Sequence, residues 1–554
     1  MGGDTHSNKP RRTTVKSGCR TCKIRKKKCD EGRPACYRCV STGRVCDGYG
    51  IWGGGGNFYG QRESFVVSRD RSVNLQPPAY ASILATSTEE KRYFEWFKHR
   101  TAKKLPGAFV LAFWDTLLFQ ASQNEPAVLH AILTLSSVQK RGIIGANDQG
   151  QNDGTPDEQE QFMLQHYIKA IRHLEPHFLT KDRASVRVAL ITCVVFICLE
   201  FLRGHFRTAE THLQNGLRVL RELQTTSTLD DGILFLEPFR DSIDDWIVEA
   251  FSRLHVQVEL FKYSYKHPCS ILHTSGSEPS TSKFLSRNGA WQQLERLLNK
   301  IFHLTERGRQ RRVSNNPTIE RPSALLEHQQ QIQAELVRWL AKYEASKDDL
   351  ESQERPGFVG RILLEYHTMA SMMTDACLCL DDESIFDSYT EQFVSLINQS
   401  AYMWECRLPD FPAQQPLPRS AFHMSRSIVD IGWIPPLYYT ALKCRVHRIR
   451  LQAIRLLESA SHREGIWDSK IAARVARKVM EIEERDFYKD VELKDVFPLS
   501  SSPEYQDLSL PTPPQSYRIQ EVKVVLSDGP MDSVMLSYVQ KEINEDWKDI
   551  QVSI

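Results

Sequence analysis

The stretch CRTCKIRKKKC, residues 19–29, places three cysteines and six basic residues within eleven positions. Six residues later, CYRCVSTGRVC at 36–46 repeats the spacing C-x2-C-x6-C. Two zinc ions that each require four sulfur ligands need eight metal–sulfur bonds, so six thiolates suffice only if two of them bridge the metals. The spacing therefore predicts a dizinc cluster whose ligands are Cys19, Cys22, Cys29, Cys36, Cys39 and Cys46.

The repeat also suggests how the two metals share these ligands. We expect each C-x2-C pair to begin a short helix and the first cysteine of each repeat, Cys19 and Cys36, to lie between the zinc ions. One zinc would then be held by Cys19, Cys22, Cys29 and Cys36, and the other by Cys36, Cys39, Cys46 and Cys19. Because so short a module has few apolar residues, metal binding must supply most of its folding free energy.

The N-terminal segment is basic although the whole chain is almost neutral. Between Lys9 and Cys46 there are 13 Lys or Arg residues against Asp30 and Glu31, a formal charge of +11, which leaves −9 for the rest of a chain whose net charge is +2. Such asymmetry is expected of a nucleic-acid-binding segment attached to a separate domain. The polar N-terminus lacks the apolar segment of a secretion signal, which favours a reducing compartment and metal ligands over disulfides.

The complete cysteine string has KIRKKK between its second and third cysteines and Pro34 before its fourth. It resembles the fungal binuclear zinc-cluster transcription factors, whose clusters hold two zinc ions with six cysteines. The resemblance implies that the helix after the first cysteine pair enters the major groove at a CGG-type triplet, with Arg25 and Lys26 reading bases and Lys28 contacting the backbone. Lys and Arg are the usual donors to guanine O6 and N7, so these residue types suit that role.

The basic side chains are distributed unevenly between the two repeats. The second repeat has only Arg38 and Arg44, whereas the first has Arg20, Lys23, Arg25, Lys26, Lys27 and Lys28. We therefore expect the first repeat to face double-stranded DNA and to contact phosphates as well as bases. A zinc module that binds RNA or a protein is the alternative; RNA readers usually supply stacking aromatic side chains, and Tyr37 is the only one here.

The residues after the cluster read as a flexible, glycine-rich linker at 49–85. Apolar residues do not recur there at heptad spacing, so no coiled coil follows the cluster. Binding to DNA as a monomer, or as a homodimer formed through the rest of the chain, remains open. The other predicted segments are a basic arm at 1–16, the DNA-binding domain at 17–48, a helical regulatory domain at 86–490, and a Pro/Ser linker and tail at 491–554.

From Ser87 onward the hydrophobic pattern is helical, starting with a capping box formed by Ser87 and Glu90. The predicted helices are Phe113–Ala121, Pro126–Lys140, Gln159–Leu174, Ala184–Leu202, Thr208–Leu223, Ile243–Phe261, Trp291–Thr305, Ser323–Ala345, Val359–Leu380, Tyr389–Trp404, Leu437–Ser459 and Trp467–Glu484. A short β-hairpin is predicted from YRIQEVKVVL at 517–526 and DSVMLSYVQ at 532–540. The expected fold is mainly α: a dizinc six-cysteine cluster with two short helices, a large all-α regulatory domain and this hairpin.

The apolar run at 186–202 contains Arg187 and Glu200 and is marginal in length for a bilayer, so we interpret it as a buried helix. The helical body resembles the fungal-specific regulatory domain that accompanies the zinc cluster, on the basis of PAVLHAILTLSSV at 126–138, LQNGLRVL at 213–220 and PPLYYTALKCRVHRIRLQAIRLL at 435–457. CDGYG followed by a tryptophan, joined to this body, resembles regulators of filamentous fungi, some of which control secondary-metabolite gene clusters.

No catalytic motif is present, so we predict a transcription regulator rather than an enzyme; an enzyme targeted by its zinc module is the second alternative. His130, His166 and His212 have no cysteine or carboxylate partner at ligand spacing in the sequence, and no metal role is predicted for them. Short basic runs at 9–12 and 25–28 are of the type that nuclear import receptors bind, which is consistent with a nuclear location. Transcriptional coregulators are expected partners.

Overall fold

A computed structural model describes most of the helical body and part of the N-terminal module. The described residues are 22, 25, 27–30, 36–42, 87–109, 111–144, 158–180, 182–223, 233–236, 243–262, 270–273, 282–313, 322–351, 358–405, 428–460, 462–526, 534–541 and 547–553. The predicted arm at 1–16 and the predicted linker at 49–85 lie outside them.

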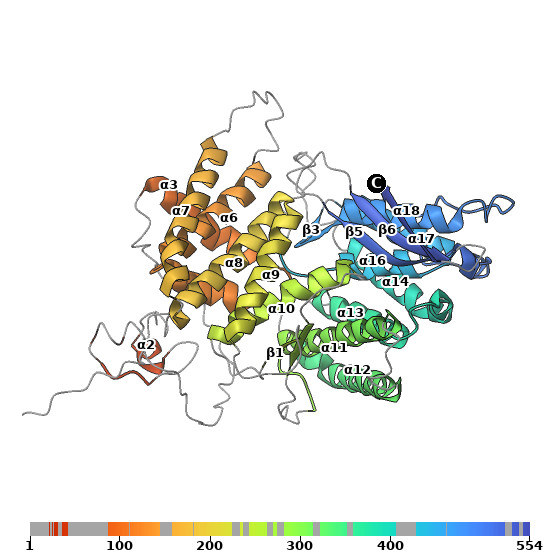
Figure 1. Ribbon diagram of the computed structural model, residues 1–554, viewed down its shortest axis with the longest axis horizontal. Coiled ribbons are helices and arrows are strands. Elements are labelled where there is room, and N and C mark those ends of the chain that lie inside the picture. Colours follow the sequence, from red (N-terminus) through yellow and green to blue (C-terminus); the bar gives the residue numbers. More distant parts are fainter. Residues whose placement is uncertain are drawn as a thin grey trace, which may run out of the picture.

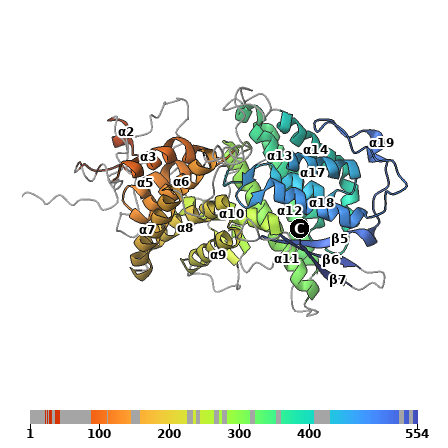
Figure 2. The same ribbon diagram turned by 90° about the horizontal axis from the view of Figure 1, so that it is seen from above.

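The body consists of helices arranged on the two sides of α10 (Ile243–Lys262), as Figures 1 and 2 show. The N-terminal side contains α3 (Thr88–Trp96), a π-helical turn (Phe97–Thr101), α4 (Ala102–Lys104), a second π-helical turn (Phe113–Leu117), α5 (Leu118–Ser122), α6 (Pro126–Ile144), α7 (Glu158–Thr180), α8 (Arg183–Arg203) and α9 (Phe206–Leu223). The other side contains α11 (Arg287–Val313), α12 (Pro322–Glu351), α13 (Phe358–Ala376), the 3-10 helix η4 (Glu383–Tyr389), α14 (Thr390–Glu405), α16 (Ile434–Lys443), α17 (His447–Ser459) and α18 (Ser469–Glu484). The predicted mainly α fold is confirmed.

Helix ends follow the side-chain signals in the sequence. At α3, the Ser87 hydroxyl accepts from the Glu90 backbone N–H at 3.0 Å while the Glu90 carboxylate accepts from the Ser87 N–H at 3.1 Å, which confirms the predicted capping box. At α8, the Asp182 carboxylate caps two backbone N–H groups, and Gly204 ends the helix with a φ of 82°. Glycine adopts this left-handed conformation without steric cost.

Most of helix α8 is buried in the body. By length and composition it could cross a membrane, but 78% of its most apolar window is buried inside the protein. Arg187, near its start, pairs with Asp244 of α10 instead of facing lipid. The prediction of a buried core helix at 186–202 is confirmed.

One hydrophobic core extends across both sides of the body. Phe109 stacks on Trp291 of α11 with 5.1 Å between ring centroids, and both side chains are fully buried. Nearby, the Arg253 guanidinium of α10 donates to Asp430 at 2.6 Å, a contact between residues far apart in the chain. This ion pair links α10 to the segment that precedes α16, and either charge would be costly to bury without the other.

The single helix predicted at 437–459 is wrong. Residues Cys444 and Val446 adopt extended backbone angles, with ψ of 136° and 111°, and divide the segment into α16 and α17. The extended link directs Arg445 inward, where it donates to the Lys443 carbonyl at 2.6 Å and to the Glu483 carboxylate at 2.8 Å. These buried charge-assisted hydrogen bonds outweigh the helical preference of the sequence.

The described residues form the predicted hairpin and several strands that were not predicted. β5 (Ile519–Val525) and β6 (Met535–Lys541) pair antiparallel, which confirms the hairpin, and β7 (Trp547–Ser553) adds a third strand beside β6. Two further pairs were not predicted: β1 (Ile233–Leu236) lies parallel to β2 (Ser270–His273), and β3 (Arg463–Glu464) lies antiparallel to β4 (Trp467–Asp468).

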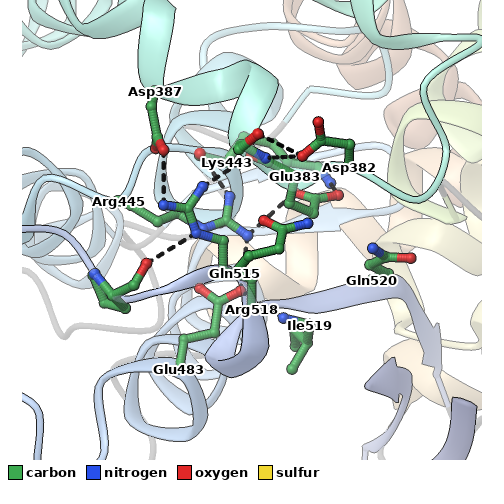
Figure 3. Close-up of polar contacts among 12 residues, drawn as sticks. Asp382, Glu383, Asp387, Lys443, Arg445, Glu483, Gln515, Arg518, Ile519 and Gln520 are labelled. Carbon is green, nitrogen blue, oxygen red and sulfur yellow. Dashed lines mark hydrogen bonds and ion pairs between the residues drawn. The ribbon is translucent and has the colours of Figure 1, made fainter. Parts of the chain in front are cut away.

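A polar network attaches the start of β5 to the helices (Figure 3). Arg518 donates to the Glu383 carbonyl at 3.1 Å and to the Asp387 carboxylate at 2.8 Å. The Ile519 backbone N–H donates to the Glu483 carboxylate at 2.9 Å. Glu383 in turn accepts from Lys443 at 2.7 Å and from Arg445 at 3.2 Å, and Arg445 also donates to Glu483. One polar network therefore joins η4, α16, α18 and the start of β5. The C-terminal sheet is therefore packed against the helical body.

Candidate metal centre and nucleic-acid interface

Three of the six predicted zinc ligands converge in the described part of the module. The sulfur atoms of Cys22, Cys29 and Cys36 lie within 4.8 Å of one another, and the Cys22 and Cys36 sulfurs are 3.7 Å apart. Four sulfurs placed tetrahedrally at about 2.3 Å from zinc lie about 3.8 Å from one another. Cys22 and Cys36 are fully buried. The geometry therefore suits one shared zinc ion.

Local hydrogen bonds hold these cysteines in place. The Lys27 backbone N–H donates to the Cys22 carbonyl at 3.0 Å and closes a turn after the first cysteine pair. The Asp30 carboxylate accepts from the N–H groups of Tyr37 and Arg38 at 2.7 and 2.9 Å, and so caps α2 (Tyr37–Val40). These hydrogen bonds connect Asp30, in the segment between the two repeats, to the helix that begins just after Cys36.

Not all of the predicted cluster is described. Cys39 falls within α2, as expected for a cysteine pair that begins a helix, but the position of its side chain is not described. Cys19 and Cys46 lie outside the described residues. The approach of Cys36 to Cys22 and Cys29 fits its assignment to the first zinc, whereas the bridging role of Cys19 and the ligands of the second zinc remain predictions.

The basic residues that are described lie at the surface of the module. Lys27 and Lys28 are exposed, and Arg25 is partly buried. Its guanidinium donates to the Thr42 hydroxyl at 3.3 Å, a contact between the two repeats. Arg20, Lys23 and Lys26 lie outside the described residues, so their predicted DNA contacts are not tested by the structure.

Tyr37 was not predicted as a site residue, although it belongs to the same small module. Tyr37 is 74% exposed, immediately after the buried Cys36, a predicted zinc ligand. Exposed tyrosine at the start of a helix can contact a nucleic-acid backbone through its hydroxyl. The feature of the sequence that could have identified Tyr37 is that it is the one aromatic residue within the cluster.

Three cysteines of the helical body lie where burial determines their chemistry. Burial raises the pKa of Cys193, Cys377 and Cys444 to about 12, so these thiols stay protonated. Protonated thiols are poor metal ligands and poor nucleophiles. They are packing residues.

Comparisons with known proteins fall on the same two regions. The model of the fungal Zn(2)-Cys(6) binuclear cluster domain matches residues 17–51, and that of the fungal specific transcription factor domain matches residues 111–380. The aspercryptin biosynthesis cluster-specific transcription regulator of Emericella nidulans is 31% identical over 261 residues, 44% of this chain and 39% of the relative. A transcription regulator of Purpureocillium lilacinum is 27% identical over 38% of this chain and 50% of the relative.

A shorter match covers a small part of the chain. The pestheic acid cluster transcriptional regulator 3 of Pestalotiopsis fici is 54% identical over 35 residues, 6% of each chain. No solved structure matches this chain. The matches to the first two relatives span half of their length or less. These relatives are named as transcription regulators. The chain matches the models of both the fungal Zn(2)-Cys(6) binuclear cluster domain and the fungal specific transcription factor domain, which confirms the predicted resemblance to fungal zinc-cluster transcription regulators.

Proposed function

We propose that the protein is a nuclear, sequence-specific DNA-binding regulator of genes transcribed by RNA polymerase II, reading a CGG-like triplet through a dizinc cluster. The observation that carries this proposal is the convergence of Cys22, Cys29 and Cys36 at the sulfur spacing of a zinc site, next to the exposed Lys27 and Lys28. A basic surface placed on a metal-organised fold suits a polyanion that must be read in a fixed orientation.

Zinc would fold the module, and its basic residues would then make two kinds of DNA contact, to bases and to phosphates. The six cysteines would hold two Zn²⁺ ions, which organise a segment too short to build a core. Arg25 and Lys26 would contact base edges in the major groove. Phosphates would be contacted by Arg20, Lys23, Lys27 and Lys28, which raises affinity for every sequence alike.

The helical body would regulate the activity of the protein or recruit transcriptional coregulators. The regulatory domain is expected at residues 86–490. We propose that it makes no contact with DNA and that its partners are transcriptional coregulators. Two relatives bear names of biosynthetic cluster regulators, which supports the proposal that this protein controls a secondary-metabolite gene cluster. It would bind its sites as a monomer or as a homodimer formed through the body.

The test is binding of the full-length chain to a labelled duplex that contains CGG, compared with a duplex in which the triplet is scrambled. We expect preference for CGG, and loss of binding when a chelator removes zinc. Equal binding to both duplexes, or binding that survives chelation, would contradict the proposal. An organomercurial that displaces zinc from thiolates should release two zinc ions per chain; release of one would rule out the bridged cluster.

A further inference from the structure

Outside the cysteine module, three side chains with metal-binding groups meet inside the helical body. Glu90 lies on α3, His130 on α6 and His166 on α7. One donor atom of each residue lies within 4.8 Å of the donor atoms of the other two. Glu90 and His166 are only 5% and 3% exposed. The proposed DNA-binding function gives these residues no role.

The three side chains lie close enough together to share one ion, although the shortest separations involve both nitrogens of His166. The Nδ1 atoms of His130 and His166 are 3.0 Å apart, and His166 Nε2 is 3.8 Å from Glu90 Oε1. Two ligands bound at about 2.1 Å, with an angle between 90° and the tetrahedral value, lie roughly 3.0–3.4 Å apart. The Nδ1 atoms of the two histidines already have this separation. Because an imidazole binds an ion through one nitrogen only, the His166 ring or the Glu90 carboxylate must turn so that all three donors, which already lie within 4.8 Å of one another, face the same ion.

The surroundings orient the carboxylate and shield the group from water. Glu90 Oε2 accepts from the Ser87 backbone N–H at 3.1 Å, while Oε1 points toward His166. Such an outer hydrogen bond is how proteins commonly orient a ligating carboxylate. The Phe162 ring lies 4.1 Å from the His166 ring, centroid to centroid, and forms an apolar wall.

Two groups lie at the exposed edge of this cluster. Lys169 Nζ is 3.9 Å from Glu90 Oε1, but the Lys169 side chain is 46% exposed and can move into solvent when a cation binds. The His173 ring centroid is 5.5 Å from that of His130, and His173 is exposed on the same helix as His166. His173 or a water molecule can supply a fourth ligand.

We propose that Glu90, His130 and His166 bind one divalent transition-metal ion of the zinc class, which joins α3, α6 and α7. Two imidazoles and one carboxylate form a donor set that zinc accepts, and a set without thiolate is chemically distinct from the cysteine cluster. Because its three ligands come from three helices, the ion would stabilise the N-terminal side of the body.

The experiment uses the full-length chain after an organomercurial has removed thiolate-bound zinc. Zn²⁺ and, separately, Co²⁺ are titrated by calorimetry and visible spectroscopy. We expect one ion per chain, with Co²⁺ giving weak visible bands and no thiolate charge-transfer band. No metal uptake by the folded wild-type chain would overturn the proposal, and this result does not depend on how any variant folds.

Variants identify the ligands. H130Q/H166Q and E90Q should each lose the ion, whereas H367Q should keep it. His367 is a suitable control because it is also a buried histidine, but its Nε2 lies 3.0 Å from the Leu336 carbonyl oxygen. K169M should bind the ion several-fold more tightly, because a competing cation is removed. Equal metal uptake by the wild type and H130Q/H166Q would place the ion elsewhere and refute the assignment.

Discussion

At the scale of single residues, Glu483 shows how strongly one buried charge can affect the stability of the fold. Its carboxylate is fully buried and accepts from Arg445 at 2.8 Å, from Arg450 at 2.6 Å and from the Ile519 backbone N–H at 2.9 Å. Removing one member of such a set leaves the others unpaired, which typically costs about 3–5 kcal/mol. We therefore expect Glu483→Gln to lower the free energy of unfolding by roughly that amount, measured by denaturant titration.

The same helix offers a matched control. Glu481 pairs with Lys478 at 3.3 Å, and its side chain is 57% exposed. Exposed ion pairs contribute about 0–1 kcal/mol, so Glu481→Gln should change stability little. Equal effects of the two substitutions would show that the network around Glu483 adds nothing beyond surface charge.

Glu483 also makes the stability of the body depend on pH. Burial raises the pKa of this carboxyl, but the attraction of Arg445 and Arg450 exceeds that effect, and the net pKa lies below its ordinary value of 4.5. A group whose pKa is lowered by folding stabilises the protein above its unfolded pKa and loses that contribution as the pH falls. The wild type should lose stability below pH 4.5 more steeply than Glu483→Gln, as thermal unfolding across that range would show.

Two neighbouring lysines of the module test how DNA contacts are divided. Lys26→Ala should relax discrimination at one triplet position at a cost of about 1–3 kcal/mol. Lys27→Ala should weaken binding to all sequences alike and reduce its salt dependence, because Lys27 is exposed as a phosphate contact would be. Binding to CGG and scrambled duplexes at several salt concentrations separates the two effects; the same behaviour in both variants would contradict the division.

At the scale of elements, the short helix α2 depends on a cap from outside itself. Asp30 accepts from the N–H groups of Tyr37 and Arg38, which precede any intrahelical partner. Losing a capping side chain costs about 1 kcal/mol, or roughly a fivefold change in an equilibrium. Asp30→Ala should therefore release zinc to a chelator several-fold more readily. Glu31→Ala makes the same change in net charge; if it releases zinc equally, charge and not capping is responsible.

The sequence predicted elements well where the signal is local. The capping box at Ser87, the buried helix α8 and the β5–β6 hairpin follow from spacing and periodicity, and all are present. The break between α16 and α17 was missed because its cause is distant: Arg445 turns inward to reach Glu383 and Glu483. Strand β7 was missed because Lys548 and Asp549 interrupt its apolar pattern, so that only its pairing with β6 defines it.

At the scale of the molecule, the two proposed metal sites differ in how easily the sequence reveals them. The cysteines recur at fixed spacing within 28 positions, so the cluster can be read directly from the chain. Glu90, His130 and His166 come from three separate helices, and only the packing of α3, α6 and α7 brings them together. No local pattern could have predicted that group, because its geometry is a property of the tertiary fold.

The module and the helical body should respond differently to loss of zinc. The module has few apolar residues and is expected to need metal for folding, whereas the body has a continuous core that extends from Tyr93 to Tyr538. A chelator should therefore abolish binding to the CGG duplex while the far-UV circular dichroism of the helical body persists. Metal at the histidine site would add stability to the body by mass action without being needed for its fold. Collapse of the helical signal together with DNA binding would mean that the body, too, folds only around a metal.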